Sequence, residues 1–256
     1  MGLVAIRRRR DAAAGAILAI AALLRAYPLG MLGYLIARRN WRACAYMLGT
    51  CIAGGALTAA VLGAGPIASF AGMVVGGEQT LGEPLGLLRH PSNLNLGWFV
   101  RFIADHTVGD RPWAAGAGLV TELILAGLSF AAAWALVEDR YACGFALWIA
   151  LITLLSPISW QHFLVCLVPV YVSVAAACQD GAASRLTLFT AGTSYLAAFF
   201  MGGPTVGFIN AGMERLLRGH VHLWHAVPEF TFASLVLAYC AALLMTTSEN
   251  RPPANA

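Results

Sequence analysis

Long apolar stretches constrain this chain more than any other feature. Two of them, residues 43–63 and 113–137, reach the roughly 20 apolar residues that a helix needs to cross the hydrocarbon core of a bilayer. Hydrophobic residues make up 59% of the 256 residues and charged residues only 11%, against about 25% charged residues in soluble domains. The sequence therefore predicts an all-α, polytopic membrane bundle with about six full spans, and it excludes a soluble enzyme. The six predicted spans are 43–63, 113–137, 141–155, 163–177, 186–201 and 230–245.

The N-terminal region imitates a signal peptide, because the arginines at 7–10 precede an apolar run that ends at Leu24. The following Arg25-Ala26-Tyr27-Pro28 is a poor cleavage site, however, and a second apolar run continues to Ala37. Each run has only about a dozen residues, too few to span a bilayer alone. Residues 12–37 are therefore predicted to form a broken hairpin, since Pro28 removes a helical hydrogen bond. We expect residues 1–247 to form one transmembrane domain and residues 248–256 a polar tail.

The arginines predict an orientation, because cytoplasmic loops of membrane proteins are enriched in basic residues. With residues 7–10 in the cytoplasm and a hairpin that returns to the same side, six further arginines also fall inside: Arg38, Arg39, Arg42, Arg140, Arg185 and Arg251. Every histidine then falls outside: His90, His106, His162, His220, His222 and His225. We expect a multi-pass plasma-membrane protein with both termini cytoplasmic and the long loops extracytoplasmic. No basic stripe with interleaved aromatic residues suggests a nucleic-acid partner.

Arg25 is the first candidate for chemistry. A guanidinium between apolar runs is costly at membrane depth and usually lines an interior or a polar cavity. With no acid nearby in the sequence, a phosphate is an attractive partner, since arginine binds phosphate through two parallel hydrogen bonds. The alternative is an arginine that reaches the interface from a short helix.

The second candidate is the sequence from Ser156 to His162. Pro157 breaks the helix, Ser159 can satisfy freed backbone groups, and Trp160 suits a membrane interface. His162 then starts the next helix, where it can donate a hydrogen bond to an anionic substrate or leaving group. The alternative is an ordinary interfacial turn.

The third candidate is the first long loop, which holds acids, a histidine, amides and aromatic rings, as sugar recognition requires. The alternative is an ordinary outer loop. Glu122, inside a predicted span, is either a functional carboxylate or a residue paired within the bundle. His220, His222 and His225 form HxHxxH, but no acid or cysteine completes the set, so no metal and no cofactor are expected.

Two motifs resemble glycosyltransferase family 87, membrane glycosyltransferases of the C-type fold, many of which depend on polyprenol-phosphate-mannose. Residues 21–29, AALLRAYPL, followed by 38–43, RRNWRA, look like that family's "LLKxYPLL…RRRWRA" stretch. Residues 156–162, SPISWQH, are similar to its "SPxSWxHH" turn. A weaker similarity to "NQSLxGxxxR" at 92–101 retains Gly97 and Arg101. In order and spacing the resemblance covers roughly residues 12–178.

The resemblance implies transfer of a hexose, with mannose expected, from a polyprenyl-phosphate donor to a glycan or glycolipid acceptor, with membrane lipid as the surroundings. It assigns the donor phosphate to Arg25 and His162. The candidate residues for the substrate loop are His90, Asn93, Asn95, Arg101, Ser159 and Trp160.

The chain also departs from the family pattern. Arg25 replaces the usual lysine, and Phe163 replaces a second histidine. The family's catalytic aspartate precedes the first motif, whereas only eleven residues precede the first apolar run here. We therefore expect a fragment that lacks the N-terminal catalytic half, and no general base is assigned. An inactive remnant or a structural membrane subunit is the alternative, and a small transporter is a weaker one because no paired repeat is visible.

Overall fold

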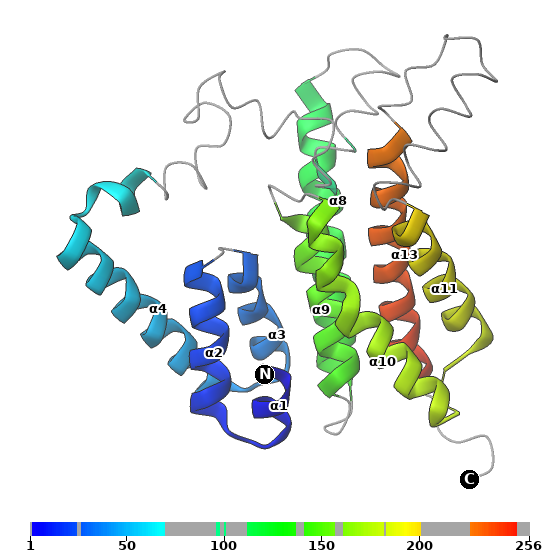
Figure 1. Ribbon diagram of the computed structural model, residues 1–256, viewed down its shortest axis with the longest axis horizontal. Coiled ribbons are helices and arrows are strands. Elements are labelled where there is room, and N and C mark those ends of the chain that lie inside the picture. Colours follow the sequence, from blue (N-terminus) through cyan, green and yellow to red (C-terminus); the bar gives the residue numbers. More distant parts are fainter. Residues whose placement is uncertain are drawn as a thin grey trace.

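The computed structural model describes residues 2–24, 27–69, 96–97, 100, 112–136, 141–156, 161–181, 183–200 and 226–249. These residues are almost entirely helical and contain no strand, which confirms the all-α prediction. The α-helices are α1 (Gly2–Arg7), α2 (Asp11–Leu24), α3 (Met31–Ala37), α4 (Trp41–Leu62), α8 (Pro112–Ala135), α9 (Tyr141–Leu155), α10 (Val168–Gln179), α11 (Arg185–Phe200) and α13 (Ala226–Glu249). Two 3₁₀ helices, η1 (Tyr27–Gly30) and η2 (Gln161–Leu167), complete the set (Figure 1).

Two of the described helices are long and apolar enough to cross a membrane. They lie at Trp41–Leu62 in α4 and Gly116–Ala135 in α8. Only 6% and 17% of their apolar windows are buried inside the protein, whereas the core helix of a soluble protein is mostly buried. The other apolar helices have 10–17 described residues, so the six full spans remain a prediction.

In the hairpin of α2, η1 and α3, the chain returns to the end of the bundle at which α2 begins. Asn40, which caps the N-terminus of α4 by accepting the Ala43 N–H at 3.1 Å, donates from Nδ2 to Asp11 Oδ1 at 2.9 Å. Because Asp11 opens α2 and Asn40 follows α3, this bond joins the two ends of the hairpin. The 14 residues of α2 give it a length of about 21 Å at 1.5 Å per residue, short of the roughly 30 Å hydrocarbon core.

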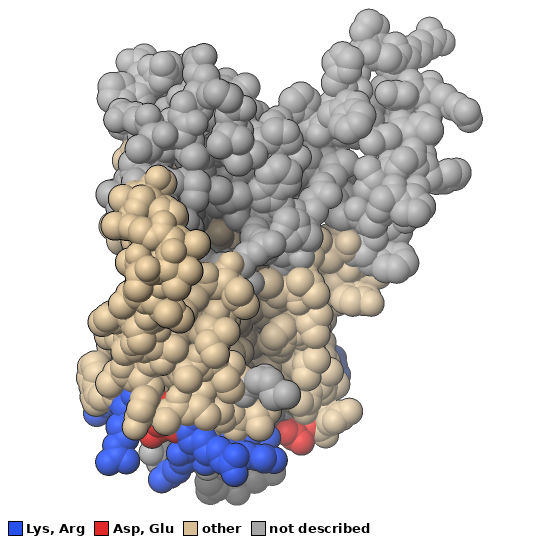
Figure 2. All heavy atoms as spheres, turned by 60° about the vertical axis from the view of Figure 1, so that its left-hand side comes forward, with Lys and Arg blue, Asp and Glu red and all other residues tan. Residues whose placement is uncertain are grey.

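The end of the bundle at which the hairpin starts carries most of the described positive charge, and we call it the arginine end. It comprises the arginines of the α1–α2 and α3–α4 connections: Arg7, Arg8, Arg9, Arg10, Arg38, Arg39 and Arg42. Figure 2 shows these side chains gathered along the lower edge of the molecule. The C-terminus of α8 lies at the same end, since Arg38 Nη1 donates to the Leu136 carbonyl at 2.6 Å and Arg39 lies 4.0 Å over the Trp134 ring.

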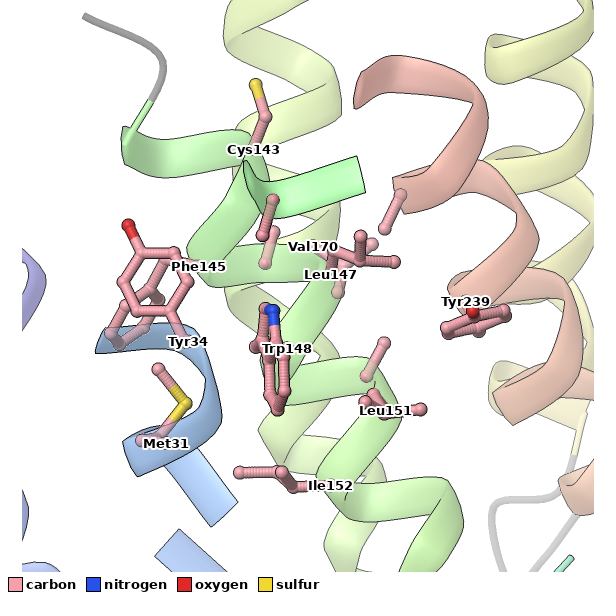
Figure 3. Packing of buried hydrophobic residues seen from close by; sticks show 14 of the residues in the cluster. Met31, Tyr34, Cys143, Phe145, Leu147, Trp148, Leu151, Ile152, Val170 and Tyr239 are labelled. Carbon is pink, nitrogen blue, oxygen red and sulfur yellow. The ribbon is translucent and has the colours of Figure 1, made fainter. Parts of the chain in front are cut away.

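Helix α9 lies at the centre of the core. Most of its residues between Cys143 and Leu154 are buried, because α3 packs on one side of it and α13 on another (Figure 3). Tyr34 of α3 meets Phe145 of α9 edge to face, with ring centroids 5.8 Å apart. Helix α9 therefore fixes the position of the hairpin relative to the rest of the bundle.

Two features differ from the sequence-based expectation. The residues expected to form one helix at 163–177 are divided between η2 and α10. Pro169 explains the division, because it has no N–H and its ring excludes the carbonyl four residues earlier, so an α-helix cannot continue through it from Val165. The short helix α1 was not expected either, and it packs on α2 and α9 with Ala5 and Ile6 buried.

Candidate functional site

The hairpin tip packs on the last turn of α9. A Cβ added to Gly30 would lie 2.5 Å from Ile152 Cγ2, and one added to Gly33 would collide with the Trp148 ring. A Cβ at either position would force the side chain of Ile152 or Trp148 to shift, so glycine permits this close approach. Pro28, at the tip, is buried as well.

The contact between Gly30 and Ile152 brings the flanks of two distant sequence motifs together. Gly30 follows the stretch of residues 21–29, and Ser156 lies one helical turn beyond Ile152, where α9 ends. Ser156 is itself buried, with 8% of its surface exposed. The next described element, η2, packs against α9, α10 and α13. The structure thus gathers the residues bordering both motifs at one place in the bundle.

Most of the predicted site residues lie outside the described residues. This holds for Arg25, His90, Asn93, Asn95, Arg101, Ser159, Trp160 and the three histidines His220, His222 and His225. For His162 the structure describes the backbone, in η2, and not the side chain. The roles assigned to all these residues remain predictions.

Glu122 is the candidate whose contacts are described. Its Oε1 accepts a hydrogen bond from the backbone N–H of Gly97 at 3.1 Å. One turn earlier in α8, Gly118 faces the same loop residue, since an added Cβ would lie 2.7 Å from the Gly97 carbonyl oxygen. The neighbouring Leu96 is buried in the core. Nothing in the sequence around Glu122 pointed to a partner 25 residues earlier in the chain.

Three features of the site lie at a similar depth. The first turn of α9 is at the arginine end, because Gly144 lies against Leu136 and Tyr34. From that end, the 15 residues of α9 reach about 22 Å and the 14 residues of α2 about 21 Å. Glu122 precedes the end of α8 at Ala135 by 13 residues, or about 20 Å. The hairpin tip, the end of α9 and Glu122 therefore lie at one level of the bundle, within the thickness of a bilayer core.

The described residues provide no cluster for a metal ion. Among them, no three His, Cys, Asp or Glu side chains lie close enough together to hold one. The six cysteines are free thiols spread over several helices. At the depth of the hairpin tip, the groups among the described residues that can bind a ligand are the Glu122 carboxylate and the backbone groups at the ends of helices, which act through hydrogen bonds.

Comparison with known proteins gives one family. The sequence model of glycosyltransferase family 87 matches residues 1–157, which is more than half of the chain. No curated protein and no solved structure matches the chain. The matched range contains the whole hairpin, Glu122 and the end of α9.

Proposed function

Because this chain belongs to glycosyltransferase family 87, a family of membrane glycosyltransferases, we propose that it takes part in transferring a hexose from a polyprenyl-phosphate carrier to a glycan or glycolipid acceptor. The reaction breaks the bond between the sugar C1 and a phosphate oxygen, and it forms a bond between C1 and an acceptor hydroxyl oxygen. The hydroxyl proton goes to a general base, and the lipid phosphate leaves with the bonding electron pair. This chain supplies groups that bind the donor and stabilise the leaving phosphate.

In this proposal Arg25 and His162 act on the phosphate. The Arg25 guanidinium binds two phosphate oxygens, and it stays positively charged at any physiological pH. His162 donates an imidazole N–H to the oxygen that becomes negative as the bond to C1 breaks. Preorganised donors of this kind act on the charge that develops in the transition state.

The contact between Gly30 and Ile152 carries the proposal. Arg25 precedes Gly30 by five residues, and His162 follows Ile152 by ten, so the packing of the hairpin on α9 joins the segments to which both belong. Nothing in the sequence between these segments, more than 100 residues long, requires such a contact. A donor site shared by the two motifs explains why it is built with two glycines.

We also propose that the arginine end faces the cytoplasm, as the arginine distribution predicts. Cys178, an exposed thiol, lies in the last turn of α10, and that end of α10 is on the same side of the bundle as the arginine end (Figure 1). A membrane-impermeant maleimide is expected to label it in inside-out vesicles and not in right-side-out vesicles, with a Cys178→Ser variant as the control. Labelling from the outer side alone would reverse the orientation.

Transfer itself is tested with the full chain in lipid nanodiscs. Polyprenyl-phosphate [³H]mannose is the donor, and an extract of envelope lipids and glycans from the source cells supplies acceptors. We expect label to move into the extract, and a nucleotide-linked mannose offered instead should give none. Equilibrium binding of the same donor is measured in parallel. Binding without transfer would indicate a donor-binding subunit, and the absence of both would contradict the proposal.

A further inference from the structure

We propose that Glu122 is a positioning residue, which fastens the helical residues Leu96 and Gly97 to α8 at the depth of the hairpin tip. Its carboxylate holds the backbone at Gly97, which lies in the part of the sequence that contains the candidate sugar-binding residues. The effect on transfer rests on the proposed function. The anchoring is a property of the folded chain and can be measured without it.

The first support is the geometry of the contact. The Gly97 N–H donates to Glu122 Oε1 at 3.1 Å, and Gly118 allows the loop backbone to approach the helix without a Cβ between them. Leu96, beside Gly97, is buried in the core with 7% of its surface exposed. A hydrogen bond, a backbone contact and a buried side chain thus fix Leu96 and Gly97 against the rest of the bundle.

The second support is the cost of placing a carboxylate here. Glu122 is the only ionisable residue among the 24 of α8, and it lies about 20 Å from the arginine end. It belongs to the helix face that includes Gly118, Ser129 and Ala133, all of which are buried. A charged group at such a depth is expensive and is a functional candidate by default. A charge-assisted hydrogen bond to the loop offsets part of that cost.

The third support is the sequence around the anchored residue. Asn93 and Asn95 stand four and two positions before Gly97, and Arg101 stands four positions after it. These are candidate residues for the substrate loop. The anchored residue thus lies between candidate sugar-binding residues in the sequence.

Hydrogen–deuterium exchange in nanodiscs tests the anchoring directly, by reading the exchange of the peptide that contains the Gly97 amide. In Glu122→Ala, which removes the acceptor, exchange is expected to accelerate at least tenfold. In Glu122→Gln, whose amide oxygen still accepts, protection should stay within about threefold of that in the native chain. Thr121→Ala is the matched control, because the hydroxyl of Thr121 donates within α8, to the Ala117 carbonyl at 2.8 Å. Unchanged exchange in Glu122→Ala would overturn the proposal.

Kinetics separate positioning from chemistry. For Glu122→Ala we expect KM for polyprenyl-phosphate mannose to rise about tenfold with a smaller change in kcat, and we expect Glu122→Gln to behave like the native chain. If Glu122 were instead the general base, Glu122→Gln would lose kcat as severely as Glu122→Ala while the Gly97 amide stayed protected, and positioning would be wrong. If the native chain shows no transfer, the proposed function fails, and the exchange experiment still decides whether Glu122 anchors the loop.

Discussion

Arg25→Ala is expected to weaken binding of polyprenyl-phosphate mannose by about 100-fold, because removing one partner of a hydrogen-bonded charge pair costs about 2–5 kcal/mol and each 1.4 kcal/mol is a factor of ten. The loss should appear in equilibrium binding to the protein in nanodiscs, before any transfer is measured. Arg25→Lys keeps the charge and loses the two-point geometry, so a loss of about tenfold is expected.

The matched control is Arg42→Ala, which removes an exposed arginine from the first turn of α4 at the arginine end. Its donor affinity should equal that of the native chain. Equal losses of donor affinity in Arg25→Ala and Arg42→Ala would mean that binding depends on the total positive charge of the protein and not on a specific site. Native affinity in Arg25→Ala would favour the alternative of a structural membrane subunit.

Gly15→Ala is expected to loosen the hairpin from α4 and to destabilise the protein by about 1–3 kcal/mol, the usual cost of overpacking. Gly15 is buried where α2 crosses α4, and a Cβ there would run into the Ala43 carbonyl and lie 2.8 Å from the Met47 nitrogen. Both obstacles are backbone atoms, so the helices must separate. Small residues commonly permit such close approach between helices in membranes. The measurement is the midpoint of thermal unfolding in detergent.

Gly49→Ala in α4 is the control for this second variant, since nothing lies within 4 Å of the Cβ that it would add. The same substitution should there stabilise the protein by about 0.5–1 kcal/mol, because alanine favours a helix. A midpoint that rises in both variants would show that α2 and α4 do not pack as closely as described.

The helical class could be predicted from the sequence because it follows from local chemistry. The length of the apolar stretches and the scarcity of charged residues exclude most other folds. Pro28 interrupts the helical hydrogen bonding between the two apolar runs that flank it. The division at Pro169 has the same local cause and could have been predicted. Helix α1 could not, because six residues are helical here only through packing on α2 and α9.

The candidate site is less visible in the sequence. The motifs indicate which residues carry chemistry, but not which segments meet. The contact between Gly30 and Ile152 joins residues more than 100 positions apart, and Glu122 accepts from a backbone N–H, a partner that every residue except proline offers. The side chains next to these residues in the sequence therefore predict neither contact. The phosphate-binding roles of Arg25 and His162 remain predictions from the motifs.

The charge of the arginine end affects the energy needed to turn the protein over in a membrane that carries a voltage. Guanidinium groups do not lose their charge in proteins, so this end stays positive at every physiological pH. Across a membrane potential of 100 mV, moving one elementary charge costs about 2.3 kcal/mol. With seven of the described arginines at one end, reversing the chain against a negative interior would cost an energy comparable with the roughly 5–15 kcal/mol that hold a typical domain folded. In the proposed orientation, with the arginine end in the cytoplasm, the membrane potential would thus help to keep the protein oriented after its synthesis is complete.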